Sequence, residues 1–86
     1  MAYRVDLSPG ARRELRGLDS GTRDRILRAL VKLETEPRPP GAKKLKGPGD
    51  ELWRVRVGDY RVVYEVRDRI LVVLVVRVAH RREVYR

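Results

Sequence analysis

Three arginines within one short stretch are the residues of this chain best suited to chemistry. Arg54, Arg56 and Arg61 lie within residues 52–66, which read Leu-Trp-Arg-Val-Arg-Val-Gly-Asp-Tyr-Arg-Val-Val-Tyr-Glu-Val. Guanidinium groups bind phosphate through paired hydrogen bonds. Positive charge fixed in place also stabilises the negative charge that develops when a phosphodiester is cleaved. These residues therefore indicate a ligand that carries phosphate.

A β-hairpin is expected to position these arginines. Gly58-Asp59 is a turn dipeptide between two runs of β-branched and aromatic residues. With these two residues as the loop, the predicted pairs are Val57 with Tyr60, Arg56 with Arg61, Val55 with Val62, Arg54 with Val63 and Trp53 with Tyr64. Alternation places the arginines on one face and Trp53, Val55, Val57, Tyr60, Val62 and Tyr64 on the other. Facing like charges destabilise a sheet, so the pair of Arg56 and Arg61 predicts an anion site.

The rest of the chain predicts one α+β domain over residues 1–86. Residues 3–7 alternate as a first strand, and Ser8-Pro9 begins a helix over residues 9–18. A second helix, residues 22–36, is expected to place Ile26, Leu27, Leu30, Val31 and Leu33 on one side. After the hairpin and a turn at residues 67–69, residues 70–78 are apolar almost without alternation, as in an interior strand.

This order predicts an N-terminal strand, a two-helix hairpin and then a three-stranded antiparallel meander. The helices should pack on one face of a small, mainly antiparallel sheet. Residues 37–50, rich in proline and glycine, are predicted to be a loop. The loop contains Lys43, Lys44 and Lys46, which are candidates for phosphate contact. The alternative is a solvated crossover between the helices and the sheet.

Charge favours a polyanionic partner. The 86 residues carry a formal net charge of +9, which attracts RNA, DNA, anionic lipid or an acidic protein. The sequence contains no cysteine and one histidine, so we expect no metal site and no cofactor. The start lacks an apolar signal region, and the apolar run at residues 70–76 is too short to span a bilayer. We therefore expect a soluble, cytoplasmic protein that does not enter a membrane.

RNA cleavage is the phosphate chemistry that requires the fewest catalytic groups from such a protein. The substrate's own 2′-hydroxyl can be the nucleophile, so the protein needs only a base, an acid and cations. Candidates for proton transfer are His80, Tyr85, Glu51 and Glu83. His80 has a suitable intrinsic pKa. It begins a basic tail, residues 80–86, that leaves the last strand beside the sheet.

Three segments carry a family resemblance. They read Lys-Lys-Leu-Lys-Gly at residues 43–47, Leu-Trp-Arg-Val-Arg-Val-Gly-Asp-Tyr-Arg-Val-Val-Tyr at residues 52–64, and Val-Ala-His-Arg-Arg-Glu-Val-Tyr at residues 78–85. Together they resemble the RelE group of the RelE/ParE toxin superfamily, over nearly the whole chain. The resemblance implies a ribosome-dependent endoribonuclease that enters the A site and cuts mRNA by metal-independent 2′-hydroxyl attack. It also implies a RelB-like antitoxin as partner.

The resemblance also assigns roles to residues. Arg54 and Arg56 match basic residues that orient the RNA and assist proton transfer. Arg61 matches the arginine that stabilises the phosphate, and Arg81 matches a second one. Tyr85 matches a tyrosine that stacks on a base and orients the nucleophile.

The proton acceptor is left open by the resemblance. His80 lies where relatives vary, and some members use a nearby histidine as acid or base. Where a relative's proposed base is lysine, this chain has arginine, which hardly deprotonates. Either His80 is the base or catalysis is almost purely electrostatic. RNA contacts are expected from Arg82, Arg54, Arg56 and the lysines at 43, 44 and 46.

Two other functions fit the same sequence. A ParE-type toxin shares the fold but inhibits DNA gyrase by binding, without ribonuclease activity. A non-catalytic basic RNA-binding module would bind RNA and never cut it. The presence of Arg61, Arg81 and Tyr85 together favours the nuclease.

Overall fold

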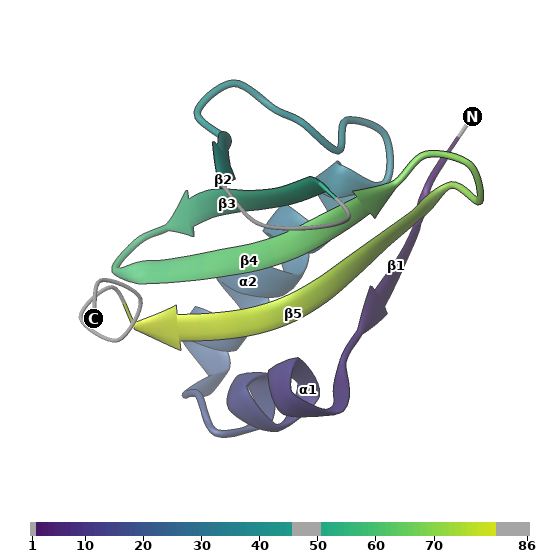
Figure 1. Ribbon diagram of the computed structural model, residues 1–86. Helices are drawn as coiled ribbons and strands as arrows, with labels where there is room; N and C mark the ends of the chain where they lie inside the picture. The colour runs from purple at the N-terminus through teal and green to yellow at the C-terminus, as the bar shows by residue number, and fades with distance from the viewer. Residues whose placement is uncertain (1, 46–50, 81–86) are drawn as a thin grey trace.

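A mixed sheet forms the framework of the computed structural model, which describes residues 2–45 and 51–80. Its elements are β1 (Arg4–Leu7), α1 (Pro9–Arg16), α2 (Ser20–Leu33), β2 (Lys43–Leu45), β3 (Glu51–Val57), β4 (Tyr60–Arg67) and β5 (Val72–His80). The strand order is β1-β5-β4-β3-β2, with β1 parallel to β5 and the other neighbours antiparallel. The helices lie on one side of this sheet (Figure 1). The predicted α+β class is confirmed.

Side-chain caps set the start of both helices. Ser8 accepts a hydrogen bond from the Ala11 amide at 3.1 Å, and Pro9 occupies the first turn of α1. Asp19 caps α2 by accepting from the Thr22 amide at 3.1 Å. Because Asp19 is the cap, α2 begins before the predicted residue 22. Both helices also end earlier than predicted, at Arg16 and Leu33.

One apolar face of the sheet packs against the helices. The buried cluster joins Ala11 and Leu15 of α1, the inner side of α2, and the buried valines and Tyr64 of β4 and β5. On α2, Ile26, Leu30 and Leu33 are buried. The prediction for Leu27 and Val31 was wrong, since these side chains are 40% and 60% exposed. They lie about 100° around the helix from their buried neighbours.

The loop predicted at residues 37–50 contains a short strand. β2 pairs antiparallel with β3 and places Lys43 opposite Arg54 and Leu45 opposite Leu52. Three residues with no clear alternation give little strand signal of their own. Pairing with the edge of β3 supplies the missing stabilisation.

The last strand starts later than predicted. Residues 68–71 form the turn, Leu71 adopts φ +54° and Ile70 is 63% exposed. β5 then runs between β1 and β4, as its apolar sequence predicts. Beyond the end of β1, α1 covers the edge of β5, where Glu14 accepts a hydrogen bond from the Val78 amide at 2.7 Å.

Candidate phosphate-binding site

The hairpin of β3 and β4 has the predicted register at every pair. Arg56 lies opposite Arg61, and Arg54 lies opposite Val63. Of the two loop residues, Gly58 alone has a positive φ, +60°, which is the pattern of a type II′ turn. Trp53, Val55, Val57, Tyr60, Val62 and Tyr64 all join the apolar side, as predicted. The three arginines therefore share the face of the sheet that points away from the helices.

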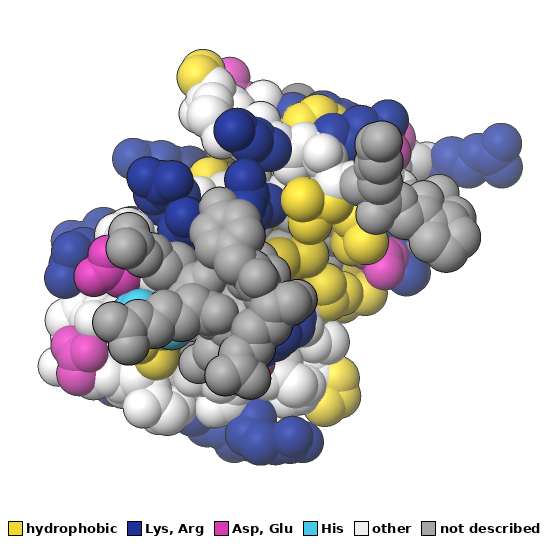
Figure 2. All heavy atoms as spheres, turned by 60° about the vertical axis from the view of Figure 1, so that its left-hand side comes forward, with side chains coloured by type: hydrophobic (Ala, Val, Ile, Leu, Met, Phe, Trp, Pro, Cys, Tyr) yellow, Lys and Arg dark blue, Asp and Glu magenta, His cyan; other side chains and the backbone are white. Residues whose placement is uncertain are grey.

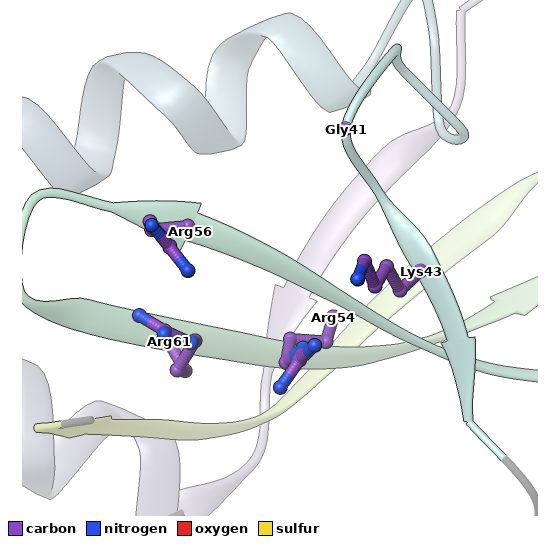
Figure 3. Close-up of a pocket in the computed structure, with 5 residues that line it drawn as sticks. All are labelled: Gly41, Lys43, Arg54, Arg56 and Arg61. Carbon is purple, nitrogen blue, oxygen red and sulfur yellow. The ribbon is translucent and has the colours of Figure 1, made fainter. Parts of the chain in front are cut away.

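These arginines line a pocket of about 320 Å³. Its described lining consists of Gly41, Lys43, Arg54, Arg56 and Arg61 (Figure 3). Arg61 is only 3% exposed, Arg54 is half-buried and Arg56 is exposed. A guanidinium this deeply placed loses little conformational freedom when it binds an anion.

Lys43 reaches the pocket because β2 exists. Lys43 pairs with Arg54 and its side chain lies beside the arginines (Figure 3). Lys44 pairs with Trp53, so alternation places it on the opposite side of the sheet. There the Lys44 ammonium lies 4.0 Å from a Glu51 carboxylate oxygen. The structure thus brings Lys43 to the arginines and keeps Lys44 away from them.

Positive charge dominates the described lining. Four of its side chains are cations and none is acidic. The space-filling view shows lysine and arginine side chains gathered beside an apolar area on this side of the molecule (Figure 2). Such a lining suits phosphate oxygens, which accept hydrogen bonds from guanidinium and ammonium groups. Among residues 2–45 and 51–80, no group of three or more His, Asp or Glu side chains could hold a metal ion.

The structure does not bring His80 to the arginines. His80 pairs with Tyr60, so its side chain lies on the side of the sheet that faces the helices. The two rings meet edge to face, with centroids 5.4 Å apart and an interplanar angle of 83°. This position does not suit a base that acts in the pocket.

Glu51 is also occupied elsewhere. Its carboxylate accepts hydrogen bonds from Arg38 and from the Trp53 indole, each at 3.1 Å, and these contacts hold its pKa below the usual value. The other predicted site residues lie outside the described residues: Lys46, Arg81, Arg82, Glu83 and Tyr85.

The contacts of Arg38, which hold the segment before Lys43, were not predicted from the sequence; we call them the Arg38 clamp. Arg38 bridges Glu51 at the start of β3 and Asp68 in the turn after β4, with 2.8 Å between its guanidinium and Asp68. Its guanidinium carbon also lies 5.6 Å from the centre of the Trp53 ring. Nearby, the buried Tyr64 hydroxyl donates to the Pro37 carbonyl at 2.8 Å. These contacts fix the course of the chain toward Gly41 and Lys43.

No helix in the described parts of the chain is long and apolar enough to cross a membrane.

Known proteins resemble this chain over nearly its full length. The family model described as "ParE toxin of type II toxin-antitoxin system, parDE" matches residues 5–85. The mRNA interferase toxin RelE of Escherichia coli (strain K12) is 39% identical over 88 residues, covering 99% of this chain and 92% of that protein. Toxin RelG of Mycobacterium tuberculosis is 35% identical over 91 residues, covering 100% and 99%.

Solved structures agree with these sequence matches. The RelE of the archaeal RelE–RelB complex from Pyrococcus horikoshii OT3 superposes with a TM-score of 0.84 at 35% identity. The match covers 94% of this chain and 97% of that one. The chain belongs to the RelE/ParE superfamily of type II toxin–antitoxin toxins, and within it to the RelE group.

Proposed function

We propose that this protein is a RelE-type toxin that inhibits translation by cutting mRNA in the ribosomal A site. The observation that carries this function is the pocket that Lys43, Arg54, Arg56 and Arg61 line on the side of the sheet away from the helices. The E. coli relative, similar over nearly all of both chains, is named an mRNA interferase. The pocket supplies the phosphate chemistry that this name requires.

In the proposed reaction the substrate's 2′-hydroxyl attacks the adjacent phosphorus. The bond to the 5′-oxygen of the next nucleotide breaks, and a 2′,3′-cyclic phosphate remains. Charge builds on the non-bridging oxygens as the new bond forms. Arg61, buried and fixed, neutralises that charge, while Arg54 and Arg56 hold the RNA. No step in this scheme uses a metal or a cofactor.

Because His80 packs on Tyr60, the proposed catalysis is almost purely electrostatic: the 2′-hydroxyl proton passes to water and the departing 5′-oxygen takes a proton from water. Family resemblance assigns the remaining roles to two residues of the tail. We propose that Arg81 adds charge at the phosphate and that Tyr85 orients the nucleophile and stacks on a base. His80 contacts Tyr60 and is not assigned a proton-transfer role.

The proposed setting is the cytoplasm, with a cognate RelB-like antitoxin encoded alongside. The P. horikoshii relative is described in complex with RelB. A partner that covers the face of the sheet carrying Arg54, Arg56 and Arg61 would offset the charge of these arginines and exclude RNA.

Primer extension on an mRNA in translating ribosomes tests the function. We expect cuts within A-site codons with the wild-type protein and with Arg28→Ala, which removes an exposed arginine from α2. We expect no cuts with Arg61→Ala. Intact mRNA together with gyrase-linked DNA breaks would establish the ParE-type activity instead. RNA binding without any cut would leave a non-catalytic module.

A further inference from the structure

The cations of the pocket form two facing pairs. Arg56 lies directly across from Arg61 on β3 and β4. Lys43 lies directly across from Arg54 on β2 and β3. The four side chains therefore extend from two pairs of facing positions, one pair farther along the sheet than the other (Figure 3).

The spacing of the two pairs matches a repeating ligand. Arg54 and Arg56 are two residues apart on β3, so they share a face and are separated by about 6–7 Å along the strand. Successive phosphates of a single nucleic-acid strand are separated by a similar distance. One strand of RNA laid along β3 would meet the two pairs in turn.

Charge and volume agree with this arrangement. A phosphodiester carries one negative charge, so a single phosphate would leave most of the four cations uncompensated. The pocket volume of about 320 Å³ exceeds the volume of one phosphate group. Two adjacent phosphates match the charge of the four cations and the volume of the pocket better than one phosphate does.

We propose that the pocket binds two consecutive phosphates of the RNA strand. The scissile phosphate lies on Arg56 and Arg61, and its neighbour lies on Lys43 and Arg54. Arg61 is buried, as suits the reacting centre, whereas Lys43 is exposed on an edge strand, as suits a binding contact. This inference deepens the proposed function and rests on the same site.

Short deoxyribonucleotides test the proposal without any cleavage. The probes are TpT, with one phosphate, TpTpT, with two, and a TpTpT whose second phosphate is an uncharged methylphosphonate. Dissociation constants come from NMR titration of isotopically labelled protein, which also reports whether each variant is folded. We expect TpTpT to bind about tenfold more tightly than TpT at low salt. The methylphosphonate probe should bind like TpT.

Lys43→Gln and Lys44→Gln form the matched pair of variants. They remove the same charge from adjacent residues, but only Lys43 lines the pocket. We expect Lys43→Gln to abolish most of the tenfold preference and to lower the salt dependence of TpTpT binding by about 0.7 in log–log slope. Lys44→Gln should keep the preference for TpTpT and the salt dependence of TpTpT binding.

The proposal is overturned if TpTpT binds no more tightly than TpT, or if Lys43→Gln keeps the full preference. These outcomes are independent of the nuclease test. A two-phosphate preference without cuts on ribosomes would sink the proposed function alone. Cuts on ribosomes without the preference would sink the two-phosphate site alone.

Discussion

At the scale of single residues, the placement of Arg61 is the central fact. It is a charged side chain with 3% exposure, directly opposite another arginine, on the side of the sheet that the helices leave uncovered. Because the Arg61 side chain is buried at the wall of the pocket, it defines where in the pocket a phosphate would bind. Arginine at this point can bind two phosphate oxygens at once, which lysine cannot do in the same geometry.

Arg61→Ala should lower the single-turnover rate of mRNA cleavage on ribosomes by about 10²–10³-fold, as loss of one fixed transition-state donor does elsewhere. Arg61→Lys keeps the charge but loses the paired hydrogen bonds, so its cleavage rate should lie between the rates of the wild type and of Arg61→Ala. Arg28→Ala, equal in charge change, should cleave at the wild-type rate. An Arg61→Ala protein that is folded and fully active would contradict the assignment.

Arg56→Thr should make the protein more stable and less active. Removal of one of two facing positive charges raises the free energy of unfolding by about 0.2–1 kcal/mol, and threonine suits a strand. The gain should shrink in high salt, which screens the repulsion. Urea denaturation measures the change in the free energy of unfolding, and Arg56→Lys is the control that keeps the repulsion. A loss of stability in Arg56→Thr would show that no repulsion is relieved.

At the scale of elements, the hairpin was predictable and β2 was not. Gly58-Asp59 and the alternation around it specify a register that the structure reproduces pair by pair. β2 depends on the edge of β3 and on contacts from Arg38, which are distant in the chain. Long-range pairing of this kind leaves no local pattern. Lys43 was therefore predicted as a phosphate contact together with Lys44, because no local pattern separates the two lysines.

The Arg38 clamp should make the fold sensitive to acid. Its guanidinium holds the pKa values of Glu51 and Asp68 below normal. Groups with lowered pKa stabilise the fold above their unfolded pKa values, near pH 4, and lose this effect as the pH falls through their folded values. Thermal denaturation should show a smaller drop in Tm from neutral to acidic pH in Arg38→Gln than in wild type. Arg28→Gln should keep the full drop, and equal drops in all three proteins would exclude the clamp as its cause.

Glu14 should anchor α1 to the edge of β5 that extends beyond β1. Its carboxylate accepts from the Val78 amide at 2.7 Å and from the Arg77 guanidinium at 3.0 Å. Glu14→Ala leaves that amide without its acceptor and should cost about 1–3 kcal/mol of unfolding free energy. Glu14→Gln keeps an acceptor oxygen and should cost less. Equal losses in chemical denaturation of the two variants would assign the effect to the ion pair with Arg77 instead.

At the scale of the whole molecule, the fold separates its tasks between two sides of one sheet. The helices bury one side and supply the core (Figure 1), while the other side carries the cation pocket (Figure 3). The sequence predicted this division from alternation alone. It did not reveal that His80 belongs to the helix side, because the residues that pair with β5 depend on the bulge near Val63 and Tyr64.

The net charge of +9 favours binding of polyanions such as RNA, and the pocket supplies the cations at which the proposed cleavage would take place. Cleavage by the substrate's own 2′-hydroxyl is the central claim that joins the two. Ribosomes carrying an mRNA with a single 2′-deoxy nucleotide at the mapped cut in the A-site codon test it most directly. We predict that the all-ribose message is cut to a 2′,3′-cyclic phosphate end and that the deoxy message stays intact. Equal cleavage of the two messages would contradict the account.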